Sequence, residues 1–247
     1  MIRTVTLTPT DVPSAANVLA VFRAGTPAHV VNGRGWYGRA RNDAREVAAI
    51  LFQTDDPTPA QVAVAAAIIA VLSPATPWAR NVHLARLVAT MAVNGATFDE
   101  MTAPSAQGGL PCMGANARKA AAIALGADPA SVVSGPKVTP FWQRVAEAGT
   151  GATGPGSVVI DRHAHDVALG QVTSDKARGL SLGRKGGHHA FAMAYVRAAA
   201  VLNRTGEAPG ITPSELQAVT WVVWRELFAH AMGKAEARKD AAREVIA

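Results

Sequence analysis

The sequence predicts an all-α fold of roughly ten helices. Apolar residues recur three and four positions apart through most of the 247 residues, which is the period of a helix with one buried face. Residues 4–8 and 157–160 show the two-residue alternation of a strand, and both runs are short. Hydrophobic residues make up 49% of the chain and charged residues 17%, a balance typical of a folded domain with a sizeable core.

The N-terminal part of the chain predicts two helices separated by a turn. The first helix begins after Asp11 or Ser14, both of which are common at helix starts. A Gly-rich turn at residues 32–35 then precedes a helix over residues 36–52. The apolar residues of this second helix share one stripe and are expected to be buried: Ala40, Ala44, Val47, Ala48 and Leu51.

The most apolar segment predicts a helix over residues 60–72 that is buried on most of its surface. Thr58 supplies an N-cap and Pro59 a first helical residue. The run is too short to span a bilayer, and it contains Gln61. A Ser-Pro turn at residues 73–77 ends it. Further helices are expected over residues 78–94, 115–125, 129–133, 137–148, 162–169, 187–202 and 213–235.

Composition excludes several classes of protein. Cys112 is the single cysteine, which excludes an internal disulfide, a four-cysteine zinc site and a cysteine-ligated iron–sulfur cluster within this chain. The first residues lack the apolar core of a signal peptide, so we expect a cytoplasmic protein with no membrane partner. The formal charge of +6 favours a polyanionic partner such as nucleic acid, although the composition of a GC-rich genome would produce the same excess of arginine.

Three segments, taken in order, carry candidate chemistry. The first is the end of the apolar helix at residues 72–76 (Leu-Ser-Pro-Ala-Thr). In the second, residues 109–110 (Gly-Leu) and 119–120 (Lys-Ala) precede residues 135–137 (Gly-Pro-Lys). The third is residues 160–163 (Ile-Asp-Arg-His), which lead into an apolar helix.

This ordered set covers about residues 60–170 and resembles the helix–hairpin–helix DNA glycosylases of the endonuclease III-like superfamily. In that family an apolar helix ends in a similar turn, a hairpin ends in Gly-x-Lys, and Val-Asp-x-His opens a later helix. The resemblance implies a divergent member without an iron–sulfur cluster, related to phage-encoded base-hypermodification enzymes on the same scaffold. It implies two helical lobes, a central one over about residues 54–145 and a second that combines about residues 1–53 with residues 146–247.

The resemblance also implies cleavage of the N-glycosidic bond of a damaged or modified base. Asp161, at the start of a helix, would stabilise the positive charge that develops on the sugar. Lys137, as a neutral amine, would displace the base and form a Schiff base, which adds abasic-site lyase activity. No cofactor is implied. A metal site is disfavoured because His163 and His165 are two positions apart on a helix and diverge.

A DNA partner would be contacted around these residues. Phosphate contacts are expected from the hairpin, the first turn and basic side chains, namely Gly135, Pro136, Arg118, Lys119, Ser73, Thr76, Arg184 and Lys185. An extruded base is expected to contact Trp36, Tyr37, Trp78 and His163. Trp221 and Trp224 have helical spacing and are either core residues or a stacking surface for a base.

Two other functions fit the same residues. One is a base-hypermodification enzyme that acts on DNA or on a modified pyrimidine nucleotide without releasing the base. The other is a catalytically inactive DNA-binding module. In each case we expect a monomer whose partner is double-stranded DNA with an extruded nucleotide, or a nucleotide.

Overall fold

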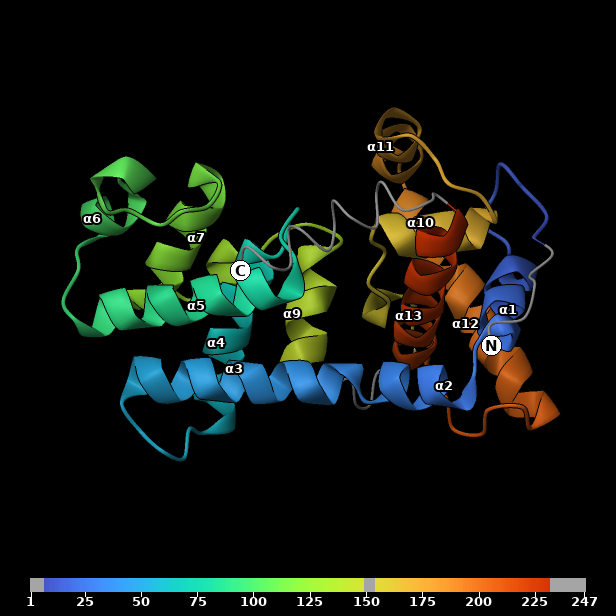
Figure 1. Cartoon of the computed structure of the whole chain (residues 1–247), viewed down its shortest axis with the longest axis horizontal. Coiled ribbons are helices and arrows are strands. Elements are labelled where there is room, and N and C mark those ends of the chain that lie inside the picture. Colours follow the sequence, from blue (N-terminus) through green and yellow to red (C-terminus); the bar gives the residue numbers. More distant parts are fainter. Residues whose placement is uncertain (1–6, 149–153, 232–247) are drawn as a thin grey trace. The chain divides into compact units, whose positions relative to one another are not determined.

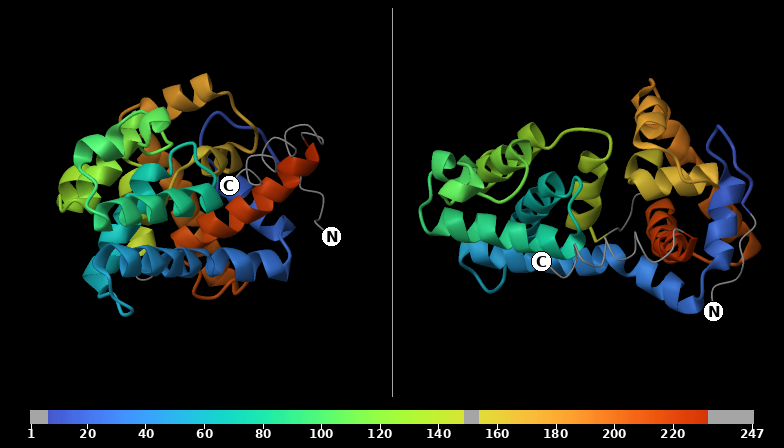
Figure 2. Two further views of the ribbon diagram at one scale, coloured as in Figure 1. Left: turned by 60° about the vertical axis from the view of Figure 1, so that its left-hand side comes forward. Right: turned by 45° about the horizontal axis from the view of Figure 1, so that its top comes forward.

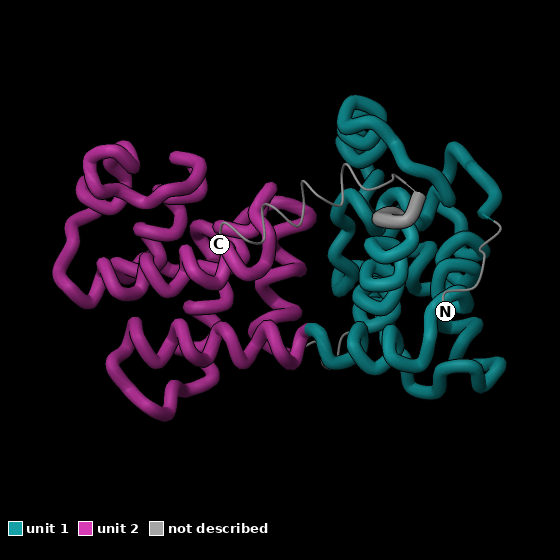
Figure 3. Tube along the Cα trace, viewed as in Figure 1, with its two compact units in different colours: residues 1–36, 151–237 teal, residues 37–150, 238–247 magenta. Residues whose placement is uncertain are grey.

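The computed structural model describes residues 7–148 and 154–231. Every regular element in these ranges is a helix, so the predicted all-α class is confirmed. The chain divides into two compact units (Figure 3), of which unit 1 includes residues 7–36 and 154–231 and unit 2 includes residues 37–148. Within the described residues, no helix combines the length and the apolar character needed to cross a membrane.

Unit 2 is built around the buried helix α4 (Pro59–Leu72) (Figure 1). The Thr58 hydroxyl accepts the backbone N–H of Gln61, and the Gln61 side chain accepts the backbone N–H of Thr58, so the start of the helix is capped in both directions. Every residue from Ala65 to Leu72 is at most 2% exposed. The prediction of a helix buried on most of its surface is therefore confirmed.

Three helices of unit 2 pack directly against α4, namely α5 (Trp78–Val93), α7 (Gly114–Ala124) and α9 (Val138–Ala146). The Trp142 indole N–H donates to the carbonyl oxygen of Ala63 at 2.8 Å and ties α9 to α4. The alanines of α4 let these neighbours approach closely, because their side chains are short. The unit also contains α3 (Trp36–Phe52), whose first residue belongs to unit 1, and α6 (Phe98–Thr102), the 3-10 turn η1 (Ser105–Gln107) and α8 (Pro129–Val132).

Unit 1 combines both ends of the described chain. Its elements are α1 (Ala15–Ala24), α2 (Pro27–Arg34), the 3-10 turn η2 (Pro155–Ser157), α10 (Arg162–Leu169), α11 (Asp175–Gly183), α12 (Gly187–Thr205) and α13 (Pro213–Ala231). Helix α13 packs against α1, α2, α10 and α12. The fully buried Tyr195 donates its hydroxyl to the carbonyl oxygen of Ala164 at 2.9 Å, which joins α12 to α10.

The prediction of a Gly-rich turn at residues 32–35 is wrong, because residues 32–34 form the last turn of helix α2. A capping box of Thr26 and His29 starts this helix, with Pro27 in its first turn. Gly33 serves a packing role: a Cβ there would lie 2.4 Å from Cα of Val219 on α13. The glycine reflects a close helix–helix approach and not a chain reversal.

Other sequence expectations differ from the structure in smaller ways. Helices α6 and α11 were not predicted. The segment 157–160 forms no strand, because Ser157 ends η2 and the next residues are extended without a partner strand among the described residues. Residues 4–6 of the other strand candidate, and residues 232–235 of the last predicted helix, lie outside the described residues.

We expect Gly33→Ala to destabilise the protein by about 1–3 kcal/mol, because the new methyl group would overlap the α13 backbone. Gly38→Ala is the matched control, since Gly38 lies inside α3 with nothing within 4 Å of the added Cβ. That substitution should be neutral or stabilise by up to about 1 kcal/mol. Urea unfolding followed by circular dichroism measures both. Equal stability of the two variants would contradict the close approach.

Candidate functional site

Asp161 is the N-cap of α10, as the sequence predicts for a helix over residues 162–169. Its backbone is extended, and its Oδ1 accepts the backbone N–H of Ala164 at 2.8 Å. This bond fixes one carboxylate oxygen at the positive end of the helix. The side chain is partly exposed, so the carboxylate is held in place without being removed from solvent.

Three rings and a guanidinium gather next to this end of α10, and we call them the ring cluster: His163, Trp36, Trp221 and Arg225. The ring of His163 meets Trp221 edge to face, with centroids 6.1 Å apart. Trp36 lies 6.3 Å from Trp221 at a tilt of 59°. The Arg225 guanidinium stands 4.8 Å from the centroid of the Trp221 ring. Trp221 is thus the centre of the cluster and only partly buried.

Burial lowers the pKa of His163 below its ordinary value. The charge of Asp161 opposes this shift, whereas the positive charges of Arg162 and Arg225 add to it. Arg162 Nε also donates to His163 Nε2 at 3.3 Å, an arrangement that requires Nε2 to carry no proton. At neutral pH the ring cluster therefore contains a neutral imidazole.

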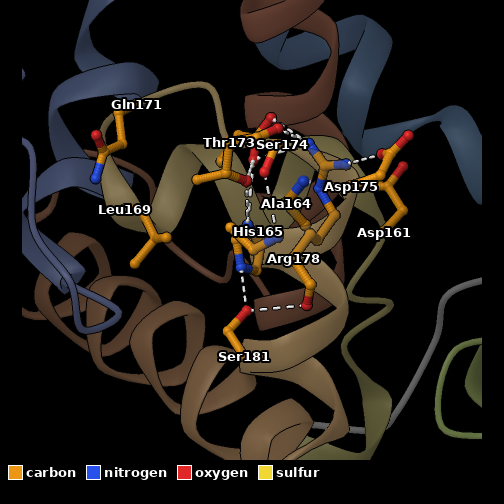
Figure 4. Close-up of polar contacts among 12 residues, drawn as sticks. Asp161, Ala164, His165, Leu169, Gln171, Thr173, Ser174, Asp175, Arg178 and Ser181 are labelled. Carbon is orange, nitrogen blue, oxygen red and sulfur yellow. Dashed lines mark hydrogen bonds and ion pairs between the residues drawn. The ribbon is translucent and has the colours of Figure 1, made fainter.

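The side chains of His165 and Asp166 enter a second, buried polar network (Figure 4). Asp166 accepts hydrogen bonds from Thr173 Oγ1 at 2.7 Å and from Arg178 Nη2 at 3.1 Å. Arg178 Nη2 also donates to the carbonyl oxygen of Thr173 at 2.8 Å. We call His165, Asp166, Thr173, Arg178 and Ser181 the α10–α11 network.

The network contains a Ser-His-Asp sequence of contacts. His165 Nε2 lies 2.6 Å from Ser181 Oγ, and His165 Nδ1 lies 3.1 Å from Asp166 Oδ1. However, the Ser181 hydroxyl also donates to the Arg178 carbonyl oxygen at 3.0 Å, and the imidazole is 0% exposed and stacks on Phe191. Because the Ser181 proton is engaged by the Arg178 carbonyl oxygen and the imidazole is not exposed, we assign the network a structural role.

In unit 2, Lys137 follows a short turn between α8 and α9. Gly135 has φ +102°, and nothing lies within 4 Å of a Cβ added there, so its backbone is open to approach. Lys119 Nζ reaches Ser134 Oγ at 3.3 Å and brings α7 to the same turn. Lys137 itself is half-buried in the N-cap position of α9.

The turn after α4 is held by its own hydroxyl groups. Ser73 Oγ donates to the carbonyl oxygen of Ala70 at 2.8 Å, and Thr76 Oγ1 donates to that of Pro74 at 3.2 Å. Ala75 adopts φ +57° between them. These predicted phosphate contacts thus also have local structural roles.

Asp43 is a candidate that the sequence analysis did not identify. Its Oδ2 accepts the indole N–H of Trp78 at 3.1 Å, and Trp78 meets Phe141 of α9 edge to face. Burial raises the pKa of Asp43, although the hydrogen bond from Trp78 opposes the shift. The signal was present in the sequence, because Asp43 occupies the apolar stripe of α3 together with Ala40 and Ala44.

The remaining predicted residues fall in different environments. Tyr37 is 3% exposed, so we leave it out of the proposed site. Arg184 and Lys185 are exposed in the turn between α11 and α12 of unit 1, and Arg118 is exposed on α7 of unit 2. Within unit 1, Trp36 and His163 both contact Trp221, and Asp161 lies two residues before His163 at the start of α10. Within unit 2, Lys119 reaches the turn that contains Gly135, Pro136 and Lys137.

No three His, Cys, Asp or Glu side chains come together as a metal-binding group in the described part of the chain. Cys112 is half-buried, and this burial raises the pKa of its thiol. A thiol with a raised pKa is a poor nucleophile at neutral pH, and we assign Cys112 no catalytic role.

Comparison with known proteins identifies the family. Residues 3–228 match a family of unknown function, DUF7178. The chain belongs to that family. No curated protein and no solved structure matches it.

Proposed function

We propose that this protein is a glycosylase-like enzyme that cleaves the bond between a damaged or modified base and its sugar in DNA. The observation that carries the proposal is the fixed carboxylate of Asp161 beside the ring cluster. Such a reaction requires a negative charge near the sugar and a surface that binds a flat aromatic ring. Both requirements are met within the first turn of α10 and the facing part of α13.

The carboxylate has a defined task in this reaction. Breaking an N-glycosidic bond leaves positive charge on C1′ and the ring oxygen of the sugar, and a fixed carboxylate stabilises that charge. One oxygen of Asp161 is engaged by the N–H of Ala164, which holds the group still during the reaction. The base departs with the electron pair of the broken bond. Trp221 and the neutral imidazole of His163 offer that base a ring surface and a polar edge.

Lys137 is the proposed nucleophile of a lyase step. As a neutral amine, its Nζ adds to the C1′ aldehyde of a ring-opened abasic sugar, and loss of water, which carries away the carbonyl oxygen and the two amine protons, gives a Schiff base. The open backbone at Gly135, next to Lys137, suits a phosphate of the same DNA strand. Lys119, which reaches the same turn, supplies a second positive charge.

The test is borohydride trapping on duplex oligonucleotides that carry one uracil, one 5-hydroxymethyluracil or one abasic site. We expect a covalent protein–DNA adduct with the wild type and none with Lys137→Ala. Lys119→Ala is the matched control: it removes a positive charge from the same turn and should weaken DNA binding, but it should still form the adduct at saturating protein because the Lys137 amine is kept. Mass spectrometry of the released bases and nucleosides accompanies each reaction.

Each outcome decides between functions. Free base without an adduct supports glycosidic cleavage and removes Lys137 as the nucleophile. An altered nucleoside without free base overturns the proposal in favour of a base-modifying enzyme. Binding of the duplex without any chemical change overturns it in favour of an inactive DNA-binding module.

A further inference from the structure

Helix α11 contributes little to the core of unit 1, where only the partly buried Leu182 packs against it. None of its nine residues is buried, and Leu180 is 62% exposed. It stands at the edge of unit 1 in every view (Figures 1 and 2). A short helix with no buried apolar face gains little from burial, so other contacts must hold it in place.

Those contacts are polar and come from two residues of the helix. Arg178 donates to Asp166 of α10, and Ser181 contacts His165 of the same helix at 2.6 Å. The side chains of both partners on α10 are at most 5% exposed. The turn after α11 is equally constrained, because a Cβ on Gly187 would lie 2.4 Å from the carbonyl oxygen of Ser181. The α10–α11 network therefore joins α11 to α10 through buried polar side chains and adds to the single apolar contact of Leu182.

The outer surface of this helix and its turn is positively charged. Lys176, Arg184 and Lys185 are all exposed. The one acidic residue of α11, Asp175, is paired with Arg178 at 2.5 Å.

We propose that α11 and the turn at residues 184–186 form a contact surface for the phosphate backbone of duplex DNA, held on unit 1 by the α10–α11 network. The proposed partner is DNA because the exposed side chains are cations and the one acidic residue of α11 is already paired with Arg178, which leaves a surface complementary in charge to a phosphate backbone. Asp161 lies at the start of the α10 helix to which this surface is anchored. The inference rests on the proposed function, since the DNA substrate supplies the phosphates.

The test measures binding of fluorescein-labelled duplex DNA by anisotropy between about 50 and 200 mM NaCl. Arg184→Ala/Lys185→Ala is compared with Arg197→Ala/Arg204→Ala, which removes the same charge from exposed positions on α12. We expect the first pair to weaken binding about tenfold and to reduce the slope of log K against log salt by about two. The control pair should change neither value.

The proposed DNA contact surface would be overturned if the wild type did not bind duplex DNA, or if the two double variants had equal effects. Binding of phosphatidylserine vesicles in place of DNA would overturn it as well. The failure of the enzymatic proposal is distinguishable from these. Asp161→Asn, which leaves α11 untouched, should keep the full salt dependence even if no base is ever released. Conversely, if the protein released bases but its DNA affinity did not depend on salt, only the proposed contact surface would be rejected, and the enzymatic proposal would stand.

The anchor is tested by variants that carry no DNA contact. Asp166→Asn removes the partner of Arg178 and should weaken DNA binding as much as the Arg184/Lys185 pair. Ser181→Ala is the milder second variant, because it removes a hydrogen bond to His165 and leaves no charge unpaired. Circular dichroism confirms that each variant is folded. Wild-type affinity in both variants would show that the network does not hold the surface.

Discussion

Asp166→Asn is expected to lower the free energy of unfolding of the protein by about 3 kcal/mol, which is typical of breaking a buried ion pair from one side. The substitution leaves the Arg178 guanidinium, whose side chain is 12% exposed, with the solvent-exposed Asp175 as its remaining acidic partner. The hydrogen bond from Thr173 would also lose its charged acceptor. Urea unfolding at pH 7, followed by far-UV circular dichroism, measures the change.

Asp175→Asn is the matched control for this prediction. Asp175 pairs with the same guanidinium, but its side chain is fully exposed to solvent. Exposed ion pairs contribute little, so we expect a change within about 1 kcal/mol. If both variants lost a comparable free energy of unfolding, burial would not explain the strength of the ion pair between Asp166 and Arg178.

The effect of Asp166 depends on pH in a defined direction. Burial alone would raise the pKa of this carboxyl, but hydrogen bonds from His165 and Thr173, together with Arg178, outweigh it and lower the pKa. A carboxyl with a lowered pKa stabilises the folded state above the value in the unfolded chain, about 3.9. That contribution is lost as the pH falls through the lower folded value. The stabilities of the wild type and Asp166→Asn should therefore converge below about pH 4.

Local signals in the sequence were sufficient for most of the fold. Thr58 and Pro59 set the start of α4, and Asp161 set the start of α10, because capping depends on residues within one turn of each other. The error at residues 32–35 has the opposite cause. Gly33 is explained by contact with Val219, which is distant in the sequence, and no local pattern reveals such an approach.

Helix α11 and its network could not be predicted for a related reason. The helix has one internal glycine, a second glycine as its last residue and no buried residue, so it lacks the apolar period from which helices are recognised. His165, Arg178 and Ser181 meet only after α11 folds back on α10. Asp161 and His163 were found as a motif, whereas the contact of His163 with Trp221 required the packing of α13.

Asp161→Asn is expected to reduce base release by about a hundredfold to a thousandfold, the usual cost of losing one preorganised electrostatic contact to a transition state. Asparagine keeps the shape of the side chain and can still cap α10 through its amide oxygen. What it removes is the negative charge that would stabilise the sugar cation. Single-turnover release of free base from the oligonucleotides described above measures the loss.

The control must separate charge at the site from helix capping. Asp128 serves this purpose, because it caps α8 in the same way, with its Oδ1 accepting the N–H of Ala130 at 3.0 Å. Asp128→Asn and Asp161→Asn should therefore change the free energy of unfolding by similar small amounts, since Asn and Asp are nearly equal as N-caps. Only Asp161→Asn should change the rate of base release. Equal rates in the two variants would reduce Asp161 to a cap and leave the ring cluster without a catalytic group.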